Sequence, residues 1–344
     1  MILPMIMGRH GSEPAQGSAM SDTLMQTVPP SVGGDPLFLE ILARFRSANP
    51  TFLIGDDVVR RYHLAMQTRG FVILSGASGT GKTWLAQAYA DAIGARPKLA
   101  AVDPSWSSNE DLLGYLSPLD GFYHHTPFSE FVQEAAREWT SADMAARTAR
   151  EFHVILDEMN LARVEHYFSR FLSAMEVRSR EGIARLDLGP GHTVELTPNL
   201  KFAGTVNVDE TTHGFADKVY DRAQLIELPL QRSYVVEFLD GEPYAELLMT
   251  IWDALRPIAP FGFRVLDEIR GYLAAADDLG TDWQTALDEQ LVQKVLPRVR
   301  GADGRLDDAL DAFLQALGDG FPLARGKAEL MREDYATHGF ASYF

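Results

Sequence analysis

The sequence predicts an α/β fold in which a parallel sheet lies between two layers of helices, followed by an all-helical lid domain. Three observations lead to this prediction. Short apolar segments alternate with helical segments up to about residue 235, as in a doubly wound sheet. Beyond that point the pattern is helical throughout, and the first apolar segment runs directly into a glycine-rich loop.

Five short apolar runs are predicted to be strands: residues 71–75, 99–102, 152–156, 200–206 and 225–228. Continuous apolar runs of this length are typical of parallel strands that are covered on both faces. The helices between them are expected to begin near Lys82 and to span residues 128–150 and 164–175. Two more helices, over residues 36–48 and 56–70, are expected before the first strand.

The helical domain contains apolar residues at helical spacing over residues 244–255, 265–276, 283–296 and 306–317. The first 34 residues instead mix Gly, Ser, Pro and Met without periodicity, so we expect a disordered tail over residues 1–34. The α/β domain is then placed over residues 35–234 and the helical lid domain over residues 235–344.

Composition narrows the possible functions. The 344 residues are 46% hydrophobic, enough for a full core. A net charge of −17 disfavours binding to nucleic acid or anionic lipid unless basic residues gather locally. The absence of cysteine excludes disulfides and thiolate chemistry. No apolar run approaches the roughly 20 residues that span a bilayer, and the start lacks the basic segment of a signal peptide. We expect a cytoplasmic protein that does not enter membranes.

The strongest motif is the glycine-rich loop between the first predicted strand and the next helix. It satisfies G-x-x-x-x-G-K-[ST] and consists of Gly76, Ala77, Ser78, Gly79, Thr80, Gly81, Lys82 and Thr83. Glycines allow backbone N–H groups to point at phosphates, and the positive helix end adds to the attraction. Lys82 is expected to contact the β- and γ-phosphates, and the Thr83 hydroxyl to ligate Mg²⁺. The sequence therefore predicts a P-loop that binds a nucleoside triphosphate.

The third predicted strand ends in two adjacent carboxylates, Asp157 and Glu158. At the carboxyl end of a parallel strand, Asp157 faces the same crevice as the glycine loop and is expected to hold Mg²⁺ directly or through water. Glu158 is then placed to orient and polarise the attacking water, because phosphoryl transfer depends mainly on positioning and electrostatics. Such a pair alone is an ordinary solvated turn, but the upstream loop favours the catalytic interpretation.

The segment GTVNVDETTHGFADKVYDRA, residues 204–223, resembles the sensor-1 strand of AAA+ ATPases and the segment that follows it. The resemblance implies that Asn207 helps to position the lytic water beside Glu158. Residues 221–223 look like the arginine-finger box, which implies that Arg222 reaches the γ-phosphate bound by a neighbouring subunit. A finger that acts in trans implies a homo-oligomer.

Residues 103–136 and 157–176 look like the McrB-type branch, the motor subunits of methylcytosine-specific restriction systems, and the related dynein/MoxR-like AAA+ group. The resemblance extends over roughly residues 36–300. It implies a ring, usually a hexamer, that passes mechanical work to a partner protein or nuclease subunit. The restriction subunits carry a separate DNA-reading domain, whereas about 70 residues precede the glycine loop here. We therefore do not expect this chain to recognise modified bases.

The family resemblance also bears on the nucleotide. Residues 293–301 resemble the lid segment that contributes a sensor-2 arginine, and both Arg298 and Arg300 are candidates. ATP with Mg²⁺ is the expected pair, because most AAA+ relatives use ATP and no guanine-specific N-K-x-D motif is present. GTP stays open, because the restriction motors use it.

The main functional expectation is an oligomeric AAA+ ATPase that remodels or drives a partner. One alternative is the GTP-driven translocase subunit of a McrB-like restriction or defence system, which a neighbouring nuclease gene would favour. Another is a nucleotide-gated chaperone or assembly module, which stimulation of hydrolysis by DNA but not by proteins would exclude.

Overall fold

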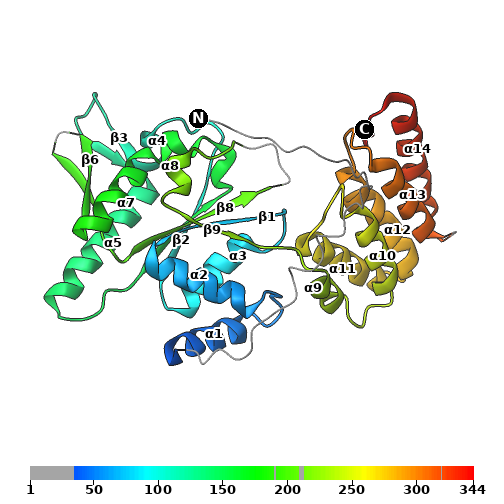
Figure 1. Ribbon diagram of the computed structural model, residues 1–344, viewed down its shortest axis with the longest axis horizontal. Helices are drawn as coiled ribbons and strands as arrows, with labels where there is room; N and C mark the ends of the chain where they lie inside the picture. Colours follow the sequence, from blue (N-terminus) through cyan, green and yellow to red (C-terminus); the bar gives the residue numbers. More distant parts are fainter. Residues whose placement is uncertain (1–34, 190, 209–212, 319) are drawn as a thin grey trace, which may run out of the picture. The chain divides into compact units, whose positions relative to one another are not determined.

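The central sheet of the computed structural model has five parallel strands in the order β2-β5-β8-β1-β9 (Figure 1). The structure describes residues 35–189, 191–208, 213–318 and 320–344, so the predicted tail lies outside the described residues. All five predicted strands lie in this sheet: β1 Phe71–Gly76, β2 Arg96–Ala101, β5 Phe152–Asp157, β8 Leu200–Asn207 and β9 Gln224–Glu227. The predicted α/β sandwich is confirmed.

Both faces of the sheet are buried, which explains the continuous apolar strands. Side chains alternate between the two faces along each strand. In β1, Phe71 and Ile73 join one apolar core, and Val72 and Leu74 join the other. All four side chains are fully buried.

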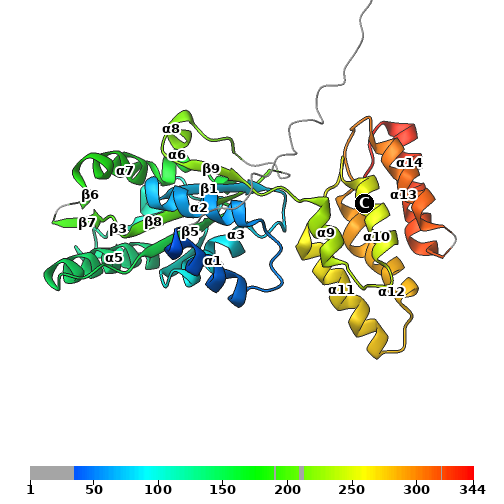
Figure 2. The same cartoon turned by 60° about the horizontal axis from the view of Figure 1, so that its bottom comes forward.

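Helices cover the two faces in separate groups (Figure 2). The core that contains Val72 and Leu74 is built with α1 Pro36–Ala48, α2 Asp56–Thr68 and α3 Lys82–Ala92. The opposite core is built with α4 Asn109–Leu113, α5 Pro127–Met144, α6 Val164–Tyr167, α7 Ser169–Glu181 and α8 Asp217–Tyr220.

Two antiparallel hairpins were not predicted. They pair β3 Gly114–Leu116 with β4 Tyr123–His125, and β6 Ala184–Gly189 with β7 His192–Leu196. The second hairpin had a signal in the sequence, because apolar residues alternate on both sides of the Gly-Pro-Gly sequence at 189–191. Leu186 and Val194 are buried in the same core as α5 and α7.

The helix predicted over residues 128–150 ends earlier, as α5. Ala146 has a φ of 50°, a left-handed conformation that a right-handed helix cannot contain. Arg147 then donates to both carboxylate oxygens of Glu138, at 2.6 and 3.0 Å, and the Arg150 backbone N–H donates to the same carboxylate at 2.9 Å. These bonds fix the connection that leads into β5.

The helix predicted over residues 164–175 is broken at Phe168 into α6 and α7. Phe168 has φ −108° and ψ 7°, and its fully buried ring stacks on Phe171 with 5.0 Å between centroids. The helix then continues beyond Met175 to Glu181. Aromatic packing therefore sets the break that helical periodicity alone did not reveal.

The C-terminal part is helical, as predicted, and has a core of its own. Its elements are α9 Arg232–Phe238, α10 Ala245–Leu255, α11 Phe263–Asp278, α12 Trp283–Gln290, a π-helical turn Leu291–Val295, a 3-10 turn Leu296–Arg298, α13 Leu306–Leu317 and α14 Pro322–His338. The core runs from Val235 to Ala341 and is centred on fully buried side chains such as Trp252. Leu37–Phe344 nevertheless form one compact unit, so the boundary at residue 235 stays a prediction.

Among the described residues, no helix has the length and apolar content needed to cross a membrane.

Candidate functional site

The predicted site residues meet at one edge of the sheet. The three central strands, β5, β8 and β1, end at Asp157, Asn207 and Gly76, respectively. Because the strands are parallel, their carboxyl ends lie together, and Gly76 is directly paired with Asn207. The crevice outside the carboxyl ends is where open α/β sheets bind ligands.

The glycine loop connects β1 to α3 and depends on glycine at two positions. Gly79 and Gly81 have φ of 79° and 88°, values that residues with a Cβ rarely adopt. A Cβ on Gly81 would also lie 2.4 Å from the Cε2 atom of Phe52. The Lys82 ammonium donates to the carbonyls of Gly76 and Ala77 at 2.9 and 2.7 Å, so its charge is held over the loop.

The two predicted magnesium ligands are in contact. The Thr83 hydroxyl, in the first turn of α3, donates to Asp157 Oδ1 at 2.6 Å. A hydroxyl and a carboxylate from two elements thus converge beside the glycine loop. This donor set fits Mg²⁺, which prefers oxygen ligands and is commonly held by one or two protein groups together with substrate phosphates.

Glu158 and Asn207 also meet. The Asn207 side-chain amide donates to Glu158 Oε1 at 3.3 Å. Glu158 adopts a left-handed conformation with φ 52° and ψ 49°, which costs about 1–2 kcal/mol for a residue other than glycine. A strained residue of this kind persists only where the surrounding structure holds it.

Thr205 supplies that support and was not among the predicted site residues. Its hydroxyl donates to Asp157 Oδ1 at 2.8 Å and accepts from the Glu158 backbone N–H at 2.9 Å. Thr205 is only 2% exposed. A signal was present, because Thr205 lies two residues before Asn207 on β8 and therefore on the same side of the strand.

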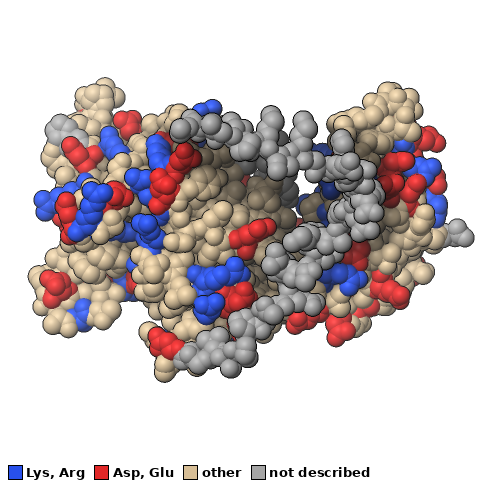
Figure 3. Space-filling model, viewed as in Figure 1, with Lys and Arg blue, Asp and Glu red and all other residues tan. Residues whose placement is uncertain are grey.

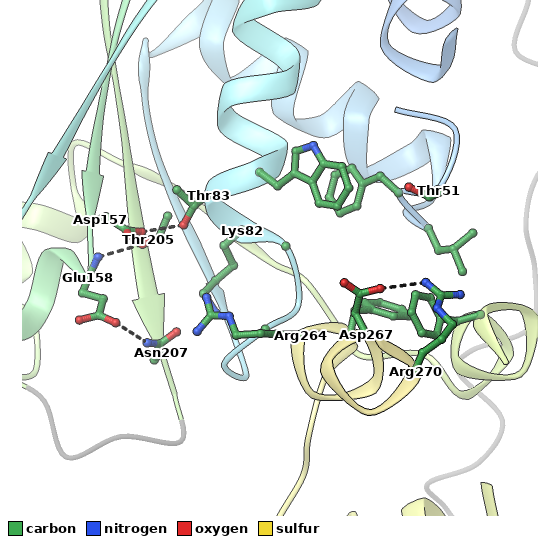
Figure 4. A pocket seen from close by; sticks show the side chains of 17 residues that line it. Thr51, Lys82, Thr83, Asp157, Glu158, Thr205, Asn207, Arg264, Asp267 and Arg270 are labelled. Atoms are coloured by element: carbon green, nitrogen blue, oxygen red, sulfur yellow. Dashed lines mark hydrogen bonds and ion pairs between the residues drawn. The ribbon is translucent and has the colours of Figure 1, made fainter. Parts of the chain in front are cut away.

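These residues line one end of a cavity of about 410 Å³ (Figure 4), a size typical of small-molecule sites. The other end is largely aromatic. The rings of Phe52 and Trp84 stack with 4.7 Å between centroids and an interplanar angle of 10°. Phe238 and Phe263 line the same region. Aromatic surfaces of this kind can stack on nucleobases. We call the end beside the glycine loop the phosphate end and the aromatic end the base end, after the ligand groups that each would suit.

The base end also carries two charged side chains from α11, Asp267 and Arg270. The Arg270 Nη2 atom donates to Asp267 Oδ1 at 2.9 Å, and the guanidinium lies 4.0 Å from the centroid of the Phe238 ring. This pair provides polar groups beside the aromatic surfaces.

Arg264, another residue of α11, is brought to the phosphate end. A Cβ on Gly79 would lie 3.0 Å from the Arg264 Cβ, and one on Gly262 would lie 2.8 Å from the Gly79 carbonyl oxygen. The start of α11 therefore packs directly on the glycine loop. In Figure 4 the Arg264 side chain extends from α11 toward Lys82.

The predicted arginines of the lid and the finger lie elsewhere. Arg298 is in the 3-10 turn Leu296–Arg298 and Arg300 follows it, and neither lines the cavity. The structure therefore does not bring either sensor-2 candidate to the site, whereas it does bring Arg264. Arg222 precedes β9, at the opposite edge of the sheet from the glycine loop, and does not line this cavity either.

Family comparison agrees with this geometry. Residues 71–207 match the model of the AAA domain of the dynein-related subfamily. The protein has the AAA+ fold. The match supports an AAA+ ATPase of the dynein/MoxR-like group, a class that binds nucleotide with Mg²⁺ and commonly oligomerises. The AAA domain match includes the glycine loop, Asp157, Glu158 and Asn207, and it ends before Arg222.

A second family model matches residues 230–340 and is described as a domain of unknown function (DUF8727). Arg264 and Arg298 both lie within this region. None of the curated proteins matches the chain. The cavity is thus lined by residues from both matched regions.

Replacement of Thr205 by Val tests its support of the AAA+ site. The change keeps the shape but leaves the backbone N–H of the half-buried Glu158 without its acceptor, which we expect to lower the free energy of unfolding by about 1–3 kcal/mol. Urea unfolding measures the change. Thr193→Val, at an exposed position of β7, is the matched control and should shift stability by about 0.5 kcal/mol or less. Equal effects at the two positions would contradict the assigned role.

Proposed function

We propose that this protein is a nucleoside triphosphatase that hydrolyses ATP with Mg²⁺ and acts as an oligomeric motor or remodeller of a partner. The observation that carries the proposal is the meeting of Lys82, the Thr83–Asp157 contact and the Glu158–Asn207 contact at one end of a single cavity. Each group has a distinct task in phosphoryl transfer.

The phosphate chain binds along the glycine loop, where backbone N–H groups and the start of α3 attract negative charge. Lys82 moves from the loop carbonyls to the β- and γ-phosphate oxygens. Thr83 and Asp157 would hold Mg²⁺, which would supply charge neutralisation for the phosphates. Most of the catalysis then comes from orientation and fixed charge.

Glu158 polarises the attacking water and draws its proton toward the carboxylate. The Asn207 amide, 3.3 Å from Glu158 Oε1, holds that carboxylate and orients the same water. Thr205 fixes the Glu158 backbone through the bond to its N–H. The strained conformation of Glu158 directs the carboxylate to the phosphate end of the cavity.

Arg264 takes the sensor-2 role that the sequence suggested for Arg298 or Arg300. Support comes from its position on α11, against Gly79 and directed toward Lys82. A guanidinium there stabilises charge on the terminal phosphate and couples the nucleotide to the lid. Arg264 thereby links hydrolysis to movement of the helical domain.

The proposal of an oligomer, in the form of a hexameric ring, depends on Arg222. Its guanidinium is held by donation from Nε to the Leu172 carbonyl at 2.8 Å and from Nη1 to the Lys218 carbonyl at 2.9 Å. At the sheet edge opposite its own glycine loop, Arg222 is placed to serve a neighbouring subunit. Completion of each site by a neighbour makes hydrolysis depend on assembly.

Nucleotide choice depends on the base end. A carboxylate accepts hydrogen bonds from the amino group of adenine and from the N1–H and amino group of guanine, so Asp267 is compatible with both. The sequence likeness of residues 103–136 and 157–176 to the McrB-type motors favours a second candidate, a GTP-driven translocase that works with a nuclease. A nuclease encoded beside this gene, together with GTP preference, is what this candidate requires.

Glu158→Gln tests the catalytic assignment. The amide keeps the size of the side chain but removes the base, so nucleotide binding should persist while turnover falls by about a hundredfold or more. Binding is measured by fluorescent-nucleotide titration and turnover by phosphate release. Glu181→Gln, on the exposed end of α7, should change neither. Hydrolysis at the wild-type rate in Glu158→Gln would remove Glu158 from the mechanism.

A pair of lid variants distinguishes the two assignments of the sensor-2 arginine. Arg264→Ala should lower turnover by about tenfold or more, because it removes a charge from the phosphate end. Arg298→Ala should leave turnover within about twofold of the wild type. The opposite pattern, measured by phosphate release at saturating nucleotide, would return the role to Arg298.

A further inference from the structure

A second cavity lies at the opposite edge of the sheet from the glycine loop. It has a volume of about 740 Å³ and its charged lining consists of Arg69, Arg178, Lys201, Arg222 and a single carboxylate, Glu176. We call it the basic pocket. Its position follows from the strands, because Lys201 lies at the start of β8, and Arg69 and Arg222 lie just before β1 and β9.

The basic pocket departs from the general charge pattern. The chain has a net charge of −17, and basic and acidic side chains are interspersed over the described part of the face in Figure 3. In the pocket, four cations face one acid, and that acid already pairs with Arg180 at 2.5 Å. A local excess of positive charge in a concave site attracts anions.

Arg178 is a half-buried cation whose hydrogen bonds go to neutral groups. Its Nη1 atom donates to the carbonyls of Thr197 and Leu200 at 3.1 and 2.7 Å, and it forms no ion pair with any residue that the structure describes. Burial lowers the pKa of Arg178 to about 10. Removal of a charge from water without a counter-ion is costly.

Lys201 lies beside Arg178 and has fewer polar partners. Its ammonium has no hydrogen-bond or ion-pair partner in the described parts of the chain. Burial lowers the pKa of Lys201; attraction to Glu151 opposes this shift, and repulsion by Arg178 adds a smaller lowering. The Glu151 carboxylate is itself bonded to His153 Nε2 at 2.8 Å. Hydrogen bonds to backbone carbonyls therefore account for the position of the Arg178 side chain, but no such bonds account for that of Lys201.

Arg222 completes the basic pocket with a fixed orientation, because its bonds to Leu172 and Lys218 use Nε and Nη1. A fixed planar guanidinium with neighbouring cations suits an oxyanion with several acceptor oxygens. A pocket of this kind is complementary in charge to a phosphoryl group, which carries up to two negative charges.

We propose that the basic pocket binds a phosphoryl oxyanion, and that in the oligomer this group is the γ-phosphate of the nucleotide held by a neighbouring copy, with Lys201 as a second cation acting in trans beside Arg222. The trans assignment rests on the proposed function, whereas the oxyanion site does not. Lys201 would then stabilise the charge that moves onto the leaving phosphate oxygens.

The test uses Lys201→Met in the full chain, which removes the charge but keeps most of the apolar stem. Lys98→Met is the matched control, because Lys98 is also a half-buried strand lysine, on β2, and does not line the basic pocket. Lys201→Met should bind nucleotide and assemble as the wild type does, with turnover lower by about tenfold to a hundredfold. Lys98→Met should keep the wild-type rate.

A mixing experiment establishes which subunit Lys201 serves. Lys82→Ala has a defective nucleotide site and an intact basic pocket, and Lys201→Met has the reverse. A mixture should therefore hydrolyse nucleotide several-fold faster than the sum of the two variants alone. A low rate in Lys201→Met that the mixture does not raise would overturn action in trans, and so would a wild-type rate in Lys201→Met.

Calorimetric titration with inorganic phosphate, in the Lys82→Ala background, tests the oxyanion site without any hydrolysis. Phosphate binding that disappears in Lys82→Ala/Lys201→Met supports the site, even if the wild type proves inactive and the proposed function fails. Phosphate binding combined with wild-type turnover in Lys201→Met would assign the basic pocket to a free oxyanion instead of the neighbour's nucleotide. Absence of both phosphate binding and any turnover defect would overturn the proposal.

Discussion

The active geometry depends on the Asp157 carboxylate, because one of its oxygens joins three elements. Asp157 Oδ1 accepts hydrogen bonds from Thr83 on α3 and from Thr205 on β8. The helix that follows the glycine loop, strand β5 and strand β8 are therefore joined at one point. The Thr205 hydroxyl extends this connection to the Glu158 backbone. Two buried or half-buried hydroxyls thus position the proposed metal ligand Asp157 and the proposed catalytic residue Glu158.

The parallel sheet also has two different edges, because all of its strands point the same way. Carboxyl ends of strands, together with the start of α3, form the edge where nucleotide is proposed to bind. Amino ends of β1, β8 and β9 form the opposite edge, where the basic pocket lies. The acidic protein thus has a local excess of positive charge at this second edge, which suits the same phosphate chemistry as the glycine loop at the first edge. If subunits pack edge to edge, one nucleotide meets both.

Much of the fold and the phosphate end of the site could be predicted from the sequence, because the decisive residues sit in contiguous motifs. The five decisive residues each end or follow a strand or begin a helix, and parallel pairing then brings them together: Lys82, Thr83, Asp157, Glu158 and Asn207. Strand alternation with helices likewise revealed the sheet. These features are local patterns that tertiary packing only has to align.

Other features depend on packing that no local pattern reveals. Arg264 reaches the phosphate end because α11 begins against Gly79, whereas Arg298 sits in a turn beyond the π-helical segment. The break at Phe168 comes from aromatic packing, and the early end of α5 comes from a left-handed alanine and the bonds to Glu138. The basic pocket collects residues that are more than 150 positions apart in the chain, from Arg69 to Arg222.

Nucleotide hydrolysis at the glycine loop can be measured as steady-state phosphate release with ATP and with GTP, each with and without Mg²⁺, by the wild type and by Lys82→Ala. We expect Mg²⁺-dependent release by the wild type, faster with ATP than with GTP, and loss of that release in Lys82→Ala. No release with either nucleotide, or equal release by Lys82→Ala, would contradict this expectation.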